Sequence, residues 1–217
     1  DLDEFRGFGG NDTIDGRGGN DLVNYANHAS NGITVNMAAG TVNAGAEGGI
    51  DTIRQIEIIT GTNFADTYNA TGYGGSSVNE NSFGESYNLF NPLAGNDTIV
   101  GNGGTILNFA NSLGGAITVD LSLLAAPGVS ANIVTAFLDD AGSSTGVTPG
   151  TLSASGINQV RGGGYNDTLL GGGRVNTDGA ATTVSGDASF EGFRGFGGND
   201  LINGRIGFDR AEYNIGN

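Results

Sequence analysis

The sequence predicts an all-β fold built from tandem repeats. Three observations support this prediction: glycine supplies 42 of the 217 residues, a nine-residue motif recurs in register, and short stretches alternate apolar with polar residues. Glycine far above its usual level of about 7% is typical of a turn-rich chain. Alternation with a period of two indicates half-buried strands. We find no convincing helical period with caps, so we expect strands and turns throughout.

The first elements are two contiguous nonapeptides, residues 7–15 and 16–24. Each carries glycine, then Asn-Asp, then an aliphatic residue at its eighth position. The frame returns at residues 195–203 and, more loosely, at 204–212, and single copies surround three further aspartates, Asp66, Asp97 and Asp167. Successive side chains on a strand point to opposite faces, so the aliphatic residue should point inward. These residues are Ile14, Val23, Ile99, Leu169 and Ile202.

A longer repeat contains the short ones. Phe5, Phe90 and Phe193 each precede a motif aspartate by seven residues, and we expect them to face the core as well. The alternating stretches Ile33–Met37 and Ile117–Leu121 match each other and predict one half-buried strand each.

These landmarks divide the chain into repeat units at residues 1–92, 93–192 and 193–217. The second unit has an insertion at about residues 121–156, whose Gly, Ser and Thr content predicts a surface loop. The third unit is only a beginning. We therefore expect the array to continue in a longer protein.

The charge excludes several classes of function. Eight basic residues, all arginine, stand against 23 acidic ones, for a net charge of −15. This balance argues against a nucleic-acid partner and against an anionic membrane surface. No stretch approaches the roughly 18 apolar residues that a membrane span needs. Cysteine is absent, so a bound metal is the expected substitute for disulfides.

The motif itself indicates which metal. A carboxylate beside glycine carbonyls is an oxygen-only ligand set, which suits Ca²⁺ and lacks the nitrogen and sulfur donors that zinc prefers. The nonapeptides resemble those of the RTX family, whose pattern is G-G-x-G-x-D-x-U-x. The resemblance implies a parallel β-roll or β-solenoid that folds on binding calcium, and secretion by a type I route to the cell surface or the medium.

The resemblance also implies a ligand set. Its carboxylates are Asp12, Asp21, Asp200 and Asp209, together with the single-copy residues Asp66, Asp97 and Asp167. Its backbone carbonyls come from Gly7, Gly9, Gly16, Gly18, Gly195 and Gly197. Neither tandem pair offers a third consecutive nonapeptide, and 101–105 has lost its aspartate, so each unit should hold only a few sites.

Other interpretations of the same residues are open. An isolated Gly-Asn-Asp is often an ordinary turn. Catalysis would have to rest on His28, the only histidine, or on Glu80 and Glu85 as a carboxylate pair in a Gly/Ser/Asn-rich loop, and we expect neither to be catalytic.

The expected function is structural: a calcium-binding segment of an adhesin, surface layer or extracellular filament. Its expected partners are calcium, neighbouring repeat units or copies of itself, and, as an alternative, extracellular polysaccharide. One rival is a calcium-dependent carbohydrate-binding module, which would expose Phe8, Tyr165 and Phe196 in line on one face. The other is the non-catalytic RTX tail of a secreted enzyme.

Overall fold

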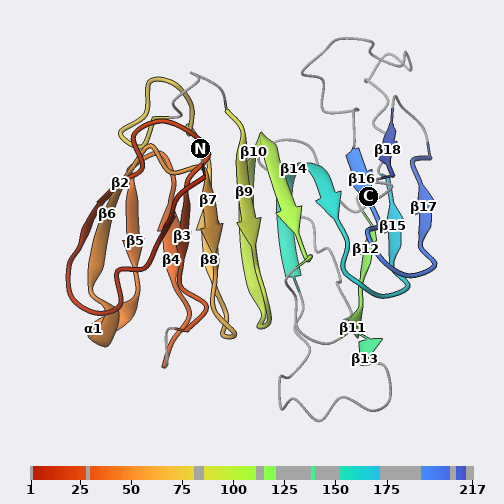
Figure 1. Ribbon diagram of the computed structural model, residues 1–217, viewed down its shortest axis with the longest axis horizontal. Coiled ribbons are helices and arrows are strands. Elements are labelled where there is room, and N and C mark those ends of the chain that lie inside the picture. The colour runs from red at the N-terminus through yellow and green to blue at the C-terminus, as the bar shows by residue number, and fades with distance from the viewer. Residues whose placement is uncertain are drawn as a thin grey trace.

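The computed structural model describes residues 2–27, 30–80, 86–110, 115–120, 138–139, 152–171, 192–205 and 209–213. These residues form eighteen short strands and one four-residue helix, which confirms the all-β prediction. In Figure 1 the strands stand side by side, and the chain proceeds from its N-terminal strands on the left to its C-terminal strands on the right.

Eight strand segments form a wholly parallel ladder, called the first ladder below. In spatial order they are β1 (Glu4–Phe5), β3 (Leu22–Asn24), β7 (Ile58–Thr60), β9 (Asn88–Asn91), the end of β10 (Asp97–Asn108), the end of β14 (Leu152–Arg161), β16 (Gly192–Arg194) and β18 (Arg210–Glu212). Each further strand comes from a later pass of the chain, so segments distant in sequence become neighbours.

A second ladder contains the remaining strands of the same sheet. In spatial order they are β2 (Thr13–Asp15), β6 (Ile50–Arg54), β5 (Thr41–Asn43), β4 (Thr34–Asn36), β8 (Thr67–Asn69) and the beginnings of β10 and β14. Because β10 and β14 take part in both ladders, the two join into one 13-stranded sheet.

Two small sheets complete the fold. The parallel one contains β12 (Thr118–Asp120), β15 (Thr168–Leu170) and β17 (Leu201–Asn203). The antiparallel one contains β11 (Gly115–Ala116) and β13 (Leu138–Asp139). No helix in the described part of the chain is long and apolar enough to cross a membrane.

The large sheet is mixed, whereas the RTX resemblance implied a parallel one. Strand β5 runs antiparallel to both β4 and β6. The first reversal is a tight turn in which the Gly40 N–H donates to the Met37 carbonyl at 3.2 Å, with Gly40 at a φ of 63° that favours glycine. The second reversal contains the helix α1 (Gly45–Gly48). Strand β5 therefore adds a strand to the second ladder, whereas the first ladder gains none from this part of the chain.

The core lies between the two ladders. Tyr68 of the second ladder and Phe90 of the first stack with ring centroids 4.6 Å apart, and neither is exposed to solvent. The inward orientation predicted for the aliphatic motif residues is confirmed: Ile14, Val23, Ile99 and Leu169 are buried, and Ile202 packs against the core. Phe90 and Phe193 are fully buried, and Phe5 packs at the edge of the core.

The two predicted alternating strands are also present. Ile33, Val35 and Met37 around β4 are buried, as are Ile117 and Val119 around β12. Leu121 lies outside the described residues.

The insertion at about 121–156 is not entirely a surface loop, and this part of the prediction is wrong. Its last residues begin β14, where Leu152 and Ala154 are buried. Residues 138–139 form β13, and the rest of the insertion lies outside the described residues. The strand was missed because its alternation, Leu-Ser-Ala-Ser-Gly, uses small residues that resemble a loop in composition.

Candidate metal sites at the stacked turns

Carboxylates connect neighbouring turns of the chain, twice at the edge of the second ladder and once at the edge of the small parallel sheet. Asp51 Oδ1 accepts the backbone N–H of Asp12 at 2.9 Å. Asp97 Oδ1 accepts the N–H of Asp66, and Asp200 Oδ1 accepts that of Asp167, each at 2.9 Å. The same contact thus recurs three times, each time between residues at least 31 positions apart.

A second row of carboxylates follows the edge of the first ladder. Asp21 Oδ1 accepts the N–H of Asp3, and Glu57 Oε2 accepts the N–H of Asp21, both at 2.9 Å. Asp21 and Glu57 are completely buried. Burial of adjacent carboxylates is costly unless a cation or hydrogen bonds offset their charge.

Six of the seven motif aspartates fold back over a glycine five residues before them; the exception is Asp97, which has Pro92 at that position. A Cβ at Gly7 would lie 2.8 Å from Asp12 Oδ2, and one at Gly16 would lie 2.6 Å from Asp21 Oδ2. The same close approach occurs in the pairs Gly61 and Asp66, Gly162 and Asp167, Gly195 and Asp200, and Gly204 and Asp209. Glycine is needed here because any side chain would occupy the position of the carboxylate oxygen.

Two classes of turn differ in what the Oδ2 oxygen contacts. In the closed turns, Asp66 Oδ2 accepts the N–H of Thr62 at 2.7 Å, and Asp167 Oδ2 accepts that of Gly163 at 2.6 Å. In the open turns, Asp12 Oδ2 and Asp21 Oδ2 are buried and have no hydrogen-bond partner. Each open turn therefore contains a buried carboxylate oxygen that makes no hydrogen bond and that a ligand could contact.

Local backbone conformation explains the difference. Phe8 and Arg17 hold the position equivalent to Thr62, four residues before the aspartate, and have φ values of 61° and 64°. The N–H of Arg17 donates to Asp15 Oδ1 at 3.0 Å instead of to Asp21. Non-glycine residues rarely adopt this left-handed conformation, and such strain is a common property of functional turns.

At the first open site two carboxylates converge. Asp12 Oδ2 and Asp51 Oδ2 both lie against Gly7, at 2.8 and 3.1 Å from the position of its missing Cβ. The buried Tyr25 hydroxyl donates to Asp51 Oδ2 at 2.8 Å. Burial, followed by the nearby Asp51 carboxylate, raises the pKa of Tyr25. This phenol therefore stays protonated and acts as a hydrogen-bond donor.

The second open site combines a carboxylate with a carbonyl. Asp21 Oδ2 and the backbone oxygen of Gln55 both approach the space that a Cβ at Gly16 would fill. Glu57 lies beside them, since it accepts the Asp21 N–H. The donor atoms at both sites are oxygens, which are the ligands that calcium takes in proteins.

The remaining predicted ligands lie in less complete surroundings. Asp209 is exposed, and Asp200 is partly buried. Gly9 lies close to the Glu47 carbonyl, and Gly197 lies close to Gly164 of the neighbouring turn. A Cβ built at Gly18 would have no neighbour within 4 Å. No group of three or more His, Cys, Asp or Glu side chains gathers within the described ranges. Any cation there would take part of its coordination from backbone or water oxygens.

Two acidic residues of the sites escaped the sequence analysis. Asp51-Thr52-Ile53 repeats Asp12-Thr13-Ile14, and Glu57-Ile58-Ile59 parallels Asp21-Leu22-Val23. Neither stretch carries the preceding Gly-Asn that defines the motif. The only signal in the sequence for Asp51 and Glu57 was an acidic residue followed by a short β-branched or aliphatic stretch.

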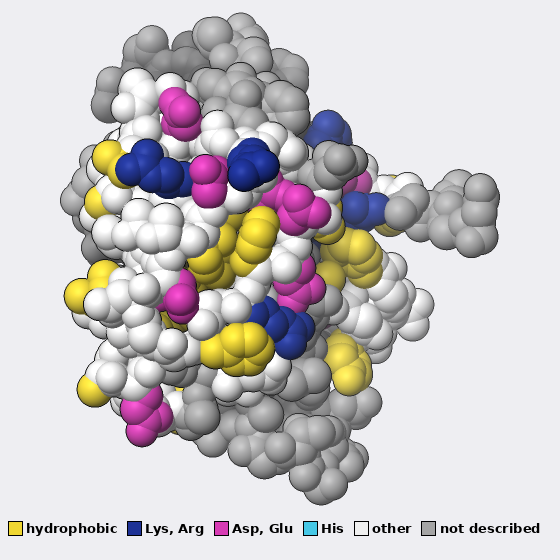
Figure 2. Space-filling model, turned by 60° about the vertical axis from the view of Figure 1, so that its left-hand side comes forward, with side chains coloured by type: hydrophobic (Ala, Val, Ile, Leu, Met, Phe, Trp, Pro, Cys, Tyr) yellow, Lys and Arg dark blue, Asp and Glu magenta, His cyan; other side chains and the backbone are white. Residues whose placement is uncertain are grey.

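The residues of the other predicted sites have different outcomes. Glu80 is exposed, and His28 and Glu85 lie outside the described residues. Phe8, Tyr165 and Phe196 are all exposed, at 77%, 39% and 49%. Tyr165 and Phe196 occupy adjacent turns, which are joined by the Asn199 N–H donating to Asn166 Oδ1 at 2.7 Å, but Phe8 lies at the opposite end of the sheet. Figure 2 shows a face on which apolar, acidic and basic side chains are intermixed.

Comparison with known proteins assigns no family, since no family model and no curated protein matches the chain.

Burial raises the pKa of three of the aspartates. The pKa of Asp97 rises to about 8 and that of Asp66 to about 6, in both cases mainly by desolvation, and the pKa of Asp167 rises for the same reason. A carboxyl whose pKa is higher in the folded state than in the unfolded chain favours folding at low pH. This contribution disappears as pH rises from the ordinary value of 3.8 through about 8 for Asp97.

We therefore expect the calcium-free protein to become more stable when pH falls from 8 to 5. Asp97→Asn should be more stable than the parent at pH 8, by on the order of a few kcal/mol, and should show a weaker pH dependence. Asparagine keeps an acceptor for the Asp66 N–H. Thermal melts in chelator across this pH range test the prediction, which fails if the variant and the parent depend equally on pH.

Proposed function

We propose that this chain is a calcium-binding structural segment of a secreted or cell-surface protein, and that its ladders are the two faces of a calcium-stabilised β-roll. The observation that carries the proposal is the Asp21 carboxylate. It is completely buried, and its Oδ2 has no hydrogen-bond partner beside the cradle of Gly16. Burial of a carboxylate oxygen without a partner is costly, and a bound cation would offset this cost.

In this proposal Asp12 and Asp51 hold one calcium ion, and Asp21, Glu57 and the Gln55 carbonyl hold another. Each ion would neutralise carboxylates on adjacent turns and link those turns together. Asp200 and Asp209, which fold over glycines in the same way, would serve the beginning of the third unit. The hydrogen-bonded carboxylates of Asp66 and Asp167 instead close their turns without metal.

The repetition of the contacts supports a structural role. The N–H of Ile33 donates to Asp66 Oδ1 at 2.8 Å, and the N–H of Ile117 donates to Asp167 Oδ1 at 2.9 Å, so two units use the same contact. Stacked units of this kind depend mainly on their neighbours for stability. Among the strands that the structure describes, the terminal strands β1 and β18 each have one partner, and we propose that their other edges meet further units or copies, as in an adhesin, surface layer or filament.

Calcium titration tests this function. The 217-residue chain is first placed in chelator, and calcium is then added while far-UV circular dichroism and calorimetry record folding and bound ions. We expect a β-type signal that grows with calcium, several ions per chain, and dissociation constants of about 10⁻⁴ to 10⁻³ M, which are usual for extracellular modules. Magnesium is the control, because it prefers small octahedral sites. An unchanged spectrum and no heat of binding would refute the proposal.

A further inference from the structure

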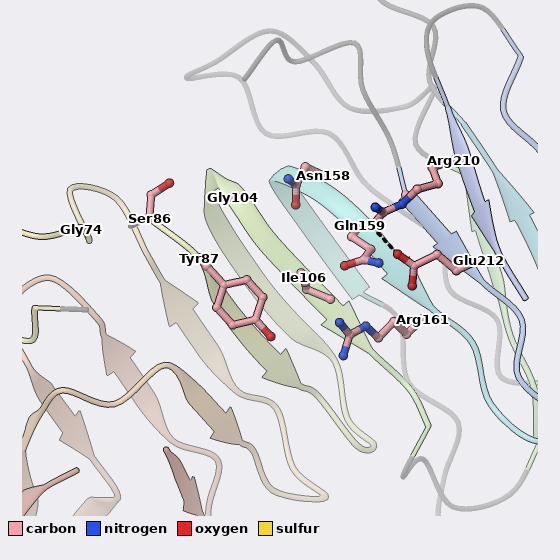
Figure 3. Close-up of a pocket in the computed structure, with 11 residues that line it drawn as sticks. Gly74, Ser86, Tyr87, Gly104, Ile106, Asn158, Gln159, Arg161, Arg210 and Glu212 are labelled. Carbon is pink, nitrogen blue, oxygen red and sulfur yellow. Dashed lines mark ion pairs between the residues drawn. The ribbon is translucent and has the colours of Figure 1, made fainter. Parts of the chain in front are cut away.

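A cavity of about 790 Å³ opens on the outer face of the first ladder. Val160 and Phe193 point from this ladder into the core, so the alternate residues of the same strands point outward. Among these are Gln159 and Arg161 on β14, which line the cavity together with Tyr87 and with Arg210 on β18, the strand paired with β16 (Figure 3).

The charge of this cavity is opposite to that of the protein. Its charged lining residues are Arg161, Arg210 and Glu212, with a sum of +1, whereas the chain carries −15. Arg210 forms an ion pair with Glu212. Within the described part of the chain no carboxylate forms an ion pair with Arg161, whose Nε is buried without a hydrogen-bond partner. Tyr87 forms a hydrogen bond with the Arg161 side chain, and Figure 3 shows its hydroxyl directed toward the guanidinium.

A β-bulge adds a second unpartnered polar group. Thr105 pairs with Ile157 and Ile106 pairs with Gln159, so Asn158 is the extra residue of β14. Asn158 lines the cavity, and its Oδ1 is buried without a hydrogen-bond partner. Bulges are frequent beside binding sites, where they redirect a side chain.

The lining selects a class of ligand. Arginine pairs well with carboxylates because its fork of N–H groups can make two parallel hydrogen bonds. The amides of Asn158 and Gln159 and the hydroxyl of Ser86 suit a ligand rich in hydroxyl groups. Ile106 is the only lining residue with an aliphatic side chain. An apolar peptide side chain would therefore bury little apolar surface in this cavity.

We propose that this cavity binds a carboxylate-bearing saccharide, with Arg161 as the main carboxylate partner and Arg210 as a second one. The lining shares no residue with the candidate calcium sites, so the proposal stands apart from the proposed function. It differs from the carbohydrate-binding interpretation of Phe8, Tyr165 and Phe196, none of which lines the cavity.

The test uses trigalacturonate as the probe, with trigalactose as its uncharged counterpart. Calorimetry of the full 217-residue chain is run at one fixed calcium concentration, with the heat of probe and calcium alone subtracted. We expect trigalacturonate to bind at least about 10-fold more tightly than trigalactose, since only its carboxylates can make charge-assisted hydrogen bonds to the arginines.

Variants locate the site. Arg161→Gln should weaken trigalacturonate binding by about 10-fold, and so should Arg210→Gln, whose exposed position makes a folding defect unexpected. Arg54→Gln, an exposed arginine on the second ladder, is the matched control and should bind as the parent does. Circular dichroism checks that each variant is folded.

Four results would overturn the proposal: no binding of trigalacturonate, equal binding of trigalactose, equal binding of a triglutamate peptide, or equal losses in Arg54→Gln and Arg161→Gln. Equal binding of triglutamate would mean simple attraction between charges. Equal losses in the two variants would place the binding elsewhere.

Discussion

Replacing Asp12 and Asp21 together with asparagine is expected to remove about two calcium ions per chain and to abolish most of the calcium-dependent stabilisation of the first unit. Asparagine keeps an oxygen that can accept a hydrogen bond, as Asp21 Oδ1 does from the Asp3 N–H, but it lacks the negative charge on which calcium affinity strongly depends. Each site occupied at 100 times its dissociation constant stabilises the fold by about 2.7 kcal/mol. Calorimetric stoichiometry and thermal melts with and without calcium measure the loss.

Melting the double variant without calcium separates the loss of calcium binding from a general loss of stability. In chelator the double variant should melt at or above the temperature of the parent, because two buried charges without hydrogen-bond partners on Oδ2 have been removed. Asp15→Asn is the matched control: Asp15 is exposed, its Oδ1 accepts the Arg17 N–H, and it belongs to neither site. If the double variant binds as many ions as Asp15→Asn, the ligand assignment is wrong.

Phe90→Ala is expected to lower the free energy of unfolding by about 3–5 kcal/mol. The Phe90 side chain is completely buried, and its ring stacks on Tyr68 of the facing ladder. The Phe90 ring also packs closely against Gly61, since a Cβ added at Gly61 would lie 3.0 Å from the ring. Alanine would leave a cavity between the two ladders, near the middle of the sheet.

Urea denaturation in calcium measures this loss. Phe8→Ala is the control, because Phe8 is 77% exposed and a surface change of this kind should stay within about 0.5 kcal/mol. Phe90→Leu should fall between the two, because it retains much of the buried volume. If Phe90→Ala costs no more than Phe8→Ala, the two ladders do not share the core described above.

The local features of the fold could be predicted from the sequence. The inward positions of Val23, Ile99 and Leu169, and the strand at Ile33–Met37, follow from a period of two residues that the chain carries within a few positions. Glycine followed by Asn-Asp likewise predicted the turns, because this signal also lies within a few positions of the chain. The backbone conformation of a turn depends mainly on its own residues, so such signals remain legible without the rest of the molecule.

The candidate sites could be predicted only in part. Asp12 and Asp21 stand out in the motif, but their neighbours Asp51 and Glu57 lie 39 and 36 residues further along the chain and lack its glycines. The sequence distinguishes Asp66 from Asp12 only by a less complete motif and by the lack of a tandem copy. The φ angles at Phe8 and Arg17 and the hydrogen bond from Thr62 are what separate open turns from closed ones.

By itself, the sequence determined the all-β class, the motif turns, the inward positions and the acidic character of the turn edges. Tertiary structure alone decided which turn stacks on which, that β5 runs antiparallel, that the end of the insertion begins β14, and that Arg161 and Arg210 share a cavity. The physical reason is that stacking register is a non-local property. It depends on burial and hydrogen bonding between segments 30 or more residues apart, and these contacts leave little trace in the local pattern.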